Sequence, residues 1–233
     1  MRDYKSCDCL CAPEGGAARL KKVGGLAVGG AATVTVGAAL YVYLIRPWHL
    51  RWQTTPEEAS QPMPGDDLVP NPTIALTRAI TIEAPPASVW PWLVQMGYRR
   101  AGWYSYDFFD NDGVHVDRIL PEFQDLKVGD LMRTDASGGF RVEAIDPGRC
   151  IVAMIHGEET GSSADIGICL MLRPLDPEGQ RTRLTLRLRG RFWGASGRLF
   201  GLVFDFGDFL FMRKMLVGIK QRAAAAYRLT SAA

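Results

Sequence analysis

The sequence predicts an α+β fold, in which a run of antiparallel strands precedes a long C-terminal helix and a single transmembrane helix precedes both. Three observations indicate this. Residues 24–45 carry no charge, residues 75–192 contain short extended segments separated by turn residues, and residues 198–229 show helical apolar spacing. At 233 residues, 47% of them hydrophobic and 22% charged, the chain has room for one ordinary domain and additional segments.

Charge and cysteine usage exclude several classes of function. The net charge is +2 and no zinc-finger, RNA-binding or helix-turn-helix signature is present, so we expect no nucleic-acid partner. Cys7, Cys9 and Cys11 are bunched in an N-terminal tail, and five cysteines in all do not suit a disulfide framework. A C-x-C-x-C run could bind a soft metal, but no fourth ligand lies nearby. We therefore expect neither a metal nor a cofactor, and the role of the three thiols stays open.

The N-terminal region is expected to be a tail followed by a membrane anchor. Residues 1–23 mix charge with Gly and Ala and show no period, which is typical of disorder. Residues 24–45 would span about 33 Å as a helix at about 1.5 Å per residue, enough for a bilayer core. A cleaved signal peptide and a buried core helix are the alternatives. The length of the apolar run and the lack of an A-x-A site favour an uncleaved anchor.

Basic residues at positions 19–22 favour a cytoplasmic N-terminus, with the main domain outside and Trp48 and Trp52 at the membrane interface. Small residues recur every fourth position within the anchor. Such a stripe allows close helix approach and predicts a possible homo-oligomer. The stripe consists of Gly25, Gly29, Thr33 and Gly37.

Residues 46–74 contain six prolines, and each proline removes a backbone donor and biases its predecessor toward extended geometry. We expect a semi-stiff Pro-rich linker that holds the next domain near the membrane without fusing the two. The main domain is expected over residues 75–230.

The domain begins with a half-buried strand over residues 75–83 and a short helix over 88–95, which Ser88 would cap and Gly97 would end. Alternation and turn residues then predict five further strands. These strands are expected over residues 129–134, 140–145, 150–155, 166–172 and 181–192.

The strand over 181–192 has an apolar face and a basic face. Its leucines alternate with Arg183, Arg187, Arg189 and Arg191. The arginine row would be either a solvated outer face, which is the usual fate of such charges, or a surface resting on anionic lipid headgroups.

The segment 198–229 has an unusually wide apolar arc, and Asp205, Asp208 and Lys220 share its far side. A helix that only lies on a sheet needs a narrower stripe, so this helix is expected to cover the sheet and also to face a cavity. Its charges argue against a second membrane span.

Residues 88–112 are dense in aromatics and hold three of the six tryptophans. Because Tyr and Trp combine a large apolar area with a polar tip, this density is typical either of a heavy core or of the lining of an apolar pocket.

The order of elements, with the segments TRAITIEAPPASVWPWLVQMG, RRAGWYSYDFFDN, PEFQDLKVGD and MRKMLVGIKQRAA, resembles the START-like, polyketide-cyclase-like superfamily (SRPBCC) over roughly residues 65 to 229. The resemblance implies a helix-grip fold, an antiparallel sheet wrapped around the long C-terminal helix. It also implies a hydrophobic cavity for lipids, sterols, polyketides or other apolar molecules. Many such proteins are carriers or binders, and a minority are cyclases or hydrolases.

The leading hypothesis is a membrane-anchored module that binds a hydrophobic small molecule or lipid between the sheet and the last helix. Apolar burial would supply most of the affinity, and a tyrosine hydroxyl would orient the ligand. The expected ligand contacts are Trp90, Trp103, Tyr104, Tyr106, Phe204 and Phe211.

Two alternatives stay open. A cyclase- or hydrolase-like enzyme would transfer protons through the weak candidates His115, Asp107 and Tyr106, and it requires the histidine and the aspartate to converge within hydrogen-bond reach at one cavity. No G-x-S-x-G, H-E-x-x-H, P-loop or G-x-G-x-x-G motif supports it, and His115 also suits a surface turn. The other alternative is a tethered interaction domain with a filled, dry core.

Overall fold

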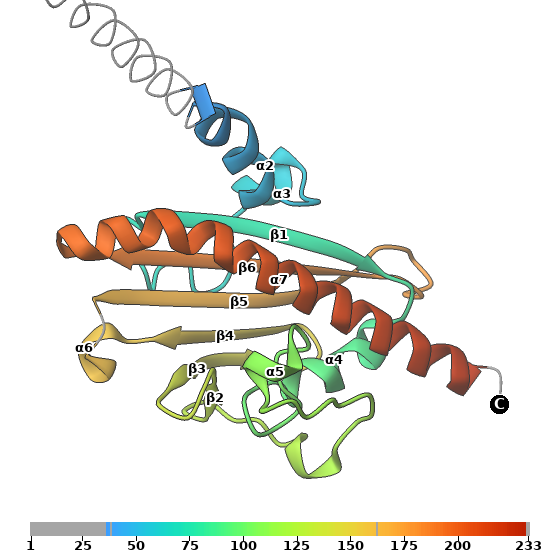
Figure 1. The fold of residues 1–233 in the computed structure, drawn as a ribbon. Coiled ribbons are helices and arrows are strands. Elements are labelled where there is room, and N and C mark those ends of the chain that lie inside the picture. Colours follow the sequence, from blue (N-terminus) through green and yellow to red (C-terminus); the bar gives the residue numbers. More distant parts are fainter. Residues whose placement is uncertain (1–35, 38, 162, 232–233) are drawn as a thin grey trace, which may run out of the picture. The chain divides into compact units, whose positions relative to one another are not determined.

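The structure is a computed structural model that describes residues 36–37, 39–161 and 163–231, and the chain divides into two compact units at the Arg46/Pro47 boundary (Figure 1). The first unit ends in the π-helix η1 (Tyr41–Ile45), and α2 (Arg46–Leu50) begins at the boundary. The predicted tail with its three cysteines, and residues 24–35 and 38 of the predicted anchor, lie outside the described residues. Among the described residues, no helix has both the length and the apolar character that a membrane crossing requires. Orientation and self-association through the anchor stay predictions.

The second unit is built on one antiparallel sheet of six strands, in the order β1-β6-β5-β4-β3-β2. All predicted strands are present, and their ends differ from the predicted ends by two residues at most. Each strand pairs with its neighbour in sequence except β1, which pairs with β6 along its whole length. The strands are β1 (Ile74–Ile82), β2 (Leu131–Arg133), β3 (Gly139–Asp146), β4 (Cys150–Ile155), β5 (Ala164–Pro174) and β6 (Thr182–Phe192).

Two helices cover one face of this sheet. Figure 1 shows α7 (Gly194–Ser231) crossing the face diagonally, and α4 (Pro86–Val94) packs against its C-terminal half. Most even-numbered residues of β5 and β6 point toward the helices and are buried, and Leu170 and Leu186 are fully buried. Helix α4 begins two residues before the expected Ser88 cap, because Pro86 occupies its first turn and Pro85 precedes it as N-cap.

Besides α2, which lies in the expected linker, four short helical segments were not predicted from the sequence. Their apolar periods are too brief to register. Three of them lie in loops of the domain and one lies ahead of β1. They are α3 (Pro56–Ser60), α5 (Asp107–Asp110), η2 (Pro121–Phe123) and α6 (Gly157–Thr160).

The expectation of a free linker differs from the structure, because residues 53–73, here called the strap, pack on the other face of the sheet. Within the strap, Met63 is buried against Val152 and Cys169, and Leu68 packs on the same cluster. The strap therefore belongs to the fold of the second unit. The sequence at the start of the strap does contain a helix-start motif, since Thr55 and Glu58 form a capping box at α3.

The strap also covers part of the arginine row of β6, which was expected to be exposed to solvent. Arg187 is 6% exposed and bonds to Asp66 at 2.7 Å, and Arg183 bonds to Glu58 at 2.7 Å. The expectation of a solvated row is wrong for Arg187, because the strap covers this part of the sheet and supplies carboxylates and carbonyls. Arg191, beyond the strap, is exposed and pairs with Asp165.

Helix α7 is rotated relative to the expected orientation. Asp205 and the Asp208 side chain are buried rather than solvated, whereas Phe206 and Phe211 are partly exposed. The cause is Arg78, a fully buried residue on the core face of β1 that bonds to Asp208 at 2.6 Å. A buried cation needs a counter-charge, so the acidic side of the helix faces β1.

Candidate functional site

A small apolar hollow lies between α7, the loop after α4 and the β2–β3 hairpin. Its volume is about 190 Å³, and little polar surface lines it. The residues come from three parts of the chain that lie far apart in sequence. They are Trp103, Ser105, Phe109, Asp110, Thr134, Phe140, Phe211, Met212 and Met215.

The base of the apolar hollow is fixed by hydrogen bonds that leave its surface apolar. The Trp103 indole donates to the carbonyl of Arg133 at 2.8 Å and meets Phe140 edge-to-face at 5.8 Å. Asp110, at the end of α5, accepts from the Ser105 backbone N–H at 3.0 Å and from its hydroxyl at 2.6 Å. The Trp103 N–H, the Ser105 hydroxyl and Asp110 Oδ2 are thus bonded within the protein, whereas the buried Asp110 Oδ1 has no hydrogen-bond partner among the described residues. Rings and thioethers supply most of the remaining lining.

An aromatic rim of four exposed residues adjoins the apolar hollow. Phe108 is 80% exposed and Phe109 68%, an unusual degree of exposure for phenylalanine. Ring contacts connect the rim to α7, since Tyr106 lies 5.3 Å and Phe109 6.2 Å from Phe211 between ring centroids. The aromatic rim is Tyr106, Phe108, Phe109 and Phe211.

The structure brings together Trp103, Phe211 and Tyr106 of the predicted ligand contacts but places the other three elsewhere. Trp90 is half-buried against the main core, and Phe204 packs on Phe192 with ring centroids 5.7 Å apart. Neither of them lines the apolar hollow.

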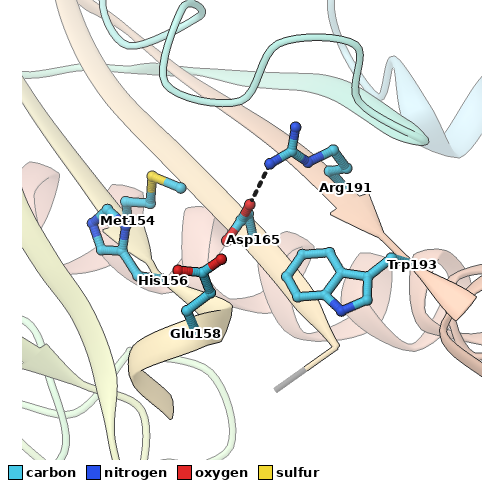
Figure 2. A pocket seen from close by; sticks show the side chains of 6 residues that line it. All are labelled: Met154, His156, Glu158, Asp165, Arg191 and Trp193. Atoms are coloured by element: carbon cyan, nitrogen blue, oxygen red, sulfur yellow. Dashed lines mark hydrogen bonds and ion pairs between the residues drawn. The ribbon is translucent and has the colours of Figure 1, made fainter. Parts of the chain in front are cut away.

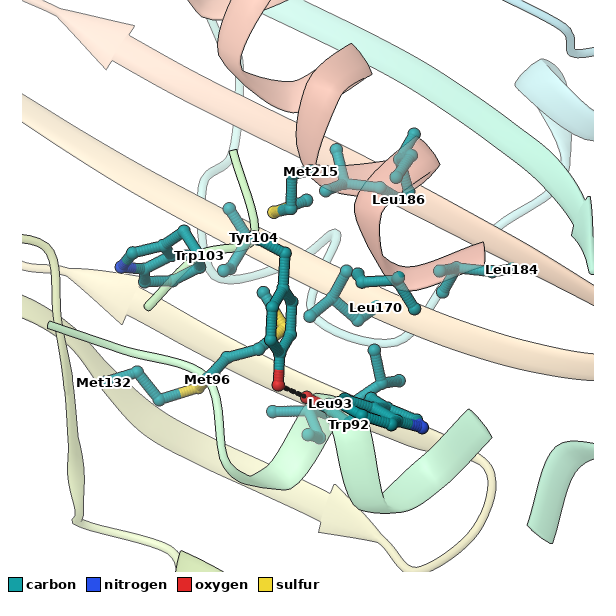
Figure 3. Close-up of a cluster of buried hydrophobic side chains, with 14 of the residues drawn as sticks. Trp92, Leu93, Met96, Trp103, Tyr104, Met132, Leu170, Leu184, Leu186 and Met215 are labelled. Atoms are coloured by element: carbon teal, nitrogen blue, oxygen red, sulfur yellow. Dashed lines mark hydrogen bonds between the residues drawn. The ribbon is translucent and has the colours of Figure 1, made fainter. Parts of the chain in front are cut away.

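Tyr104 does not line the apolar hollow either, because it is 2% exposed and sits at the centre of the core (Figure 3). Its hydroxyl donates to the carbonyl of Trp92 at 2.9 Å and accepts from Gln95 at 3.0 Å. Burial raises the pKa of Tyr104, so the hydroxyl stays protonated as a donor. Trp92, Tyr104 and their apolar neighbours fill most of the space between sheet and helices.

Gln95 is a residue whose role the sequence did not reveal. It is fully buried, and its side-chain oxygen accepts from the Leu120 backbone N–H at 2.9 Å and from Gln124 at 3.0 Å. Its amide group donates to Tyr104 and to the carbonyl of Arg118. A helix-end glutamine gives no sign in sequence of such a central network, which holds the loop 98–124 in place.

The two weak catalytic candidates do meet. His115 Nδ1 lies 2.7 Å from Asp107 Oδ2, and Arg222 Nη2 lies 3.3 Å from the same ring nitrogen. The His115 side chain is 60% exposed, and neither residue lines the apolar hollow. Arg222 also donates to the carbonyl of Val116 and lies over the ring of Tyr104 at 4.9 Å, so the group ties this loop to α7.

A larger polar hollow of about 560 Å³ lies on the opposite face of the sheet from α7 (Figure 2). Two ion pairs lie in or beside this hollow. His156 Nε2 lies 2.9 Å from Glu143, and Arg191 donates to Asp165 at 2.8 Å. These pairs leave Glu158 and the Trp193 ring facing the hollow, as Figure 2 shows. The sequence had placed His156 at a strand end, which is where it lies.

The chemistry of the apolar hollow suits burial of a ring or chain end. An apolar cavity of about 150 Å³ is enough for one benzene molecule, so about 190 Å³ holds a single ring or a short alkyl chain. Anything larger would extend over the aromatic rim. Within the described parts of the chain, no cluster of three or more His, Cys, Asp or Glu residues is placed to hold a metal ion.

Comparison with known proteins gives similarity in structure only. No family model matches the chain, and no curated protein matches it in sequence. A solved structure from Chromobacterium violaceum is 18% identical with a TM-score of 0.40, covering 66% of this chain and 96% of that chain. One from Mesorhizobium loti is 16% identical with a TM-score of 0.38, covering 64% and 98%. DynU16, from the dynemicin biosynthetic locus, is 14% identical with a TM-score of 0.37, covering 62% and 46%.

Proposed function

We propose that the chain is a membrane-anchored module that binds a hydrophobic small molecule or the end of a lipid chain in the apolar hollow. One observation carries this proposal. Four exposed aromatic side chains adjoin a hollow that is itself lined by Trp103, Phe140 and Met215. Exposed apolar patches of this kind mark interaction sites, and burial of apolar area is worth about 25 cal/mol per Å² before ordering costs.

The same proposal includes the assignment of the second unit to the helix-grip fold. The order of strand, short helix, five strands and long helix, with α7 across one face, supports a helix-grip domain of the START-like, polyketide-cyclase-like kind. The interior is mostly filled by Trp92, Tyr104 and their neighbours. The proposed ligand site is therefore restricted to the apolar hollow beside the loop 103–110, and the part of the ligand that it encloses is small.

Indole binding to the full chain, purified in a non-ionic detergent, tests this function by isothermal titration calorimetry. The substitution Met212→Trp fills the hollow from its wall, and we expect it to weaken binding at least tenfold. Leu210→Trp is the matched control, because this exposed position on the same helix lies outside the hollow. Subtracting a detergent blank removes partitioning into micelles. Binding that Met212→Trp leaves intact, or no binding above the blank, would overturn the proposal.

A second candidate function, proton transfer, is favoured by one specific observation, the 2.7 Å contact between His115 and Asp107. Asp107 would orient the ring so that Nε2 accepts a proton. Hydrolysis of p-nitrophenyl butyrate that disappears in both His115→Gln and Asp107→Asn would support an enzyme. Equal rates in the parent chain and both variants would remove this candidate.

We further propose that residues 24–45 cross the membrane once, with the N-terminus in the cytoplasm and the second unit outside. The uncharged run and the basic residues before it support this. A membrane-impermeant maleimide applied to intact cells should leave Cys7, Cys9 and Cys11 unlabelled until the cells are lysed. Labelling in intact cells would reverse the orientation. Self-association through the small-residue stripe remains part of the same proposal.

A further inference from the structure

A third hollow, here called the basic hollow, lies between the strap and the outer face of the sheet. Its volume is about 370 Å³, within the range of about 300–1,000 Å³ that is usual for small-molecule sites. Three arginines and one carboxylate line it, together with hydroxyl groups from the strap and β1. These residues are Arg51, Arg187, Arg189, Asp66, Ser60 and Thr77.

Arg187 and Asp66 form the fixed wall of the basic hollow. The Arg187 Nη1 donates to Asp66 Oδ2 at 2.7 Å and to the carbonyl of Gln61 at 2.7 Å. Its Nη2 donates to the carbonyl of Ala59 at 2.8 Å, and its Nε to the hydroxyl of Thr77 at 3.1 Å. Every nitrogen of this guanidinium is thus engaged, and its charge is balanced by Asp66.

The other two arginines keep donors available. Arg189 donates from Nε to the carbonyl of Val69 at 3.2 Å, while its Nη1 lies 3.9 Å from Asp66, beyond hydrogen-bond distance. The Arg51 guanidinium makes no hydrogen bond or ion pair with the residues that the structure describes, and it is exposed. Arg189 thus shares Asp66 with Arg187 at longer range, and Arg51 has no carboxylate partner among the described residues, so three guanidinium groups line the hollow against one carboxylate.

We propose that the basic hollow binds a phosphate group, held by Arg51 and Arg189. The planar guanidinium fork matches phosphate oxygens in bidentate fashion, and two forks on one concave surface provide charge and direction together. The phosphate belongs either to a lipid headgroup or to a soluble phosphate ester. The polar hollow has no comparable excess of positive charge, because its arginine, Arg191, is paired with Asp165. The site lies on the opposite face of the sheet from the apolar hollow, so the two proposals fail independently.

The test is calorimetric titration of the full chain in a non-ionic detergent at low ionic strength. Three probes are used: inorganic phosphate, glycerol 3-phosphate and dihexanoyl phosphatidic acid. We expect the double substitution Arg51→Gln with Arg189→Gln to weaken binding at least tenfold. The control is Arg191→Gln, which removes one positive charge from the strand and sheet face that carry Arg189 but lies outside the hollow, and it should change binding less than twofold. Affinity should also fall as salt is raised.

The probes distinguish the two sources of phosphate. Binding of all three, lost in the double variant, assigns a general phosphate-ester site. Binding of phosphatidic acid alone, lost in the double variant, assigns a lipid headgroup. Binding that survives the double variant, or that falls equally in Arg191→Gln, overturns the site, as does failure of all three probes to bind. Unchanged urea unfolding of the double variant shows that any loss is local, and Arg51→Lys with Arg189→Lys should restore part of the affinity.

Discussion

At the scale of single residues, the fold depends on a close approach between α7 and the loop that carries Tyr104. Gly218 is buried in α7, and a Cβ placed there would overlap the carbonyl oxygen of Tyr104 and lie 3.0 Å from its Cβ. Tyr104 itself has a positive φ of 57°, so its backbone has little freedom to retreat. This contact is what allows Arg222, one turn further on, to cover the tyrosine ring.

The substitution Gly218→Ala should therefore destabilise the domain by about 1–3 kcal/mol, in the range for overpacking of a tight core. Gly207→Ala is the matched control in the same helix, since a Cβ there has no neighbour within 4 Å and alanine favours helix by about 1 kcal/mol. Urea unfolding measures both. Equal stability of the two variants would show that α7 does not approach the loop this closely.

Arg78 and Asp208 are the second residue-scale feature. Burial lowers the pKa of Arg78 and raises the pKa of Asp208, although each partner favours the charged form of the other. The guanidinium of Arg78 lies 2.6 Å from the Asp208 carboxylate and 5.2 Å from the ring centroid of Phe209. Its Nε also donates to the carbonyl of His49.

Removing one partner leaves the other buried and unpaired. We expect Asp208→Asn to cost about 3–5 kcal/mol of unfolding free energy, whereas Arg78→Met combined with Asp208→Leu should recover most of that loss. The measurement is again urea unfolding of the single and double variants. A double variant less stable than Asp208→Asn would mean that the pair is worth more than its desolvation cost.

At the scale of elements, the strap shows what the sequence could not reveal. Its prolines correctly indicated extended backbone, yet a proline count says nothing about whether the segment docks. The alternation of β6 correctly separated leucines from arginines, but solvation was the wrong inference for Arg187. A long-range partner, Asp66, lies 121 residues away and has no local signature. Long-range pairing is the information that a single sequence lacks.

The substitution Asp66→Asn should loosen the strap and expose Cys169 beneath it. Burial raises the pKa of Cys169 to about 12, so the native thiol should resist iodoacetamide at pH 8. We expect Asp66→Asn to speed alkylation of Cys169 at least tenfold, as judged by peptide mass mapping. Asp67→Asn is the control, because its exposed carboxylate has no partner among the described residues. Similar rates in the two variants would show that Asp66 does not hold the strap.

At the scale of the whole molecule, the α+β class and the extents of the strands and of the last helix followed from alternation, turn residues and apolar spacing. The candidate site was only partly predictable. Trp103, Tyr106 and Phe211 meet at the hollow, but Tyr104, indistinguishable from Tyr106 in sequence, points into the core. The direction of a side chain in an irregular loop depends on its backbone angles and on partners such as Gln95, and no periodicity encodes either.

The central claim is that the hollow beside the aromatic rim takes an apolar ligand, and site-mapped photolabelling tests it most directly. The full chain in a non-ionic detergent would be irradiated with an apolar phenyl diazirine, and the labelled peptides identified by mass spectrometry. We expect labels in the peptides that contain Phe109 and Met212, and these labels should be lost in Met212→Trp and kept in Leu210→Trp. Labels confined to residues 24–45, or unchanged in Met212→Trp, would contradict it.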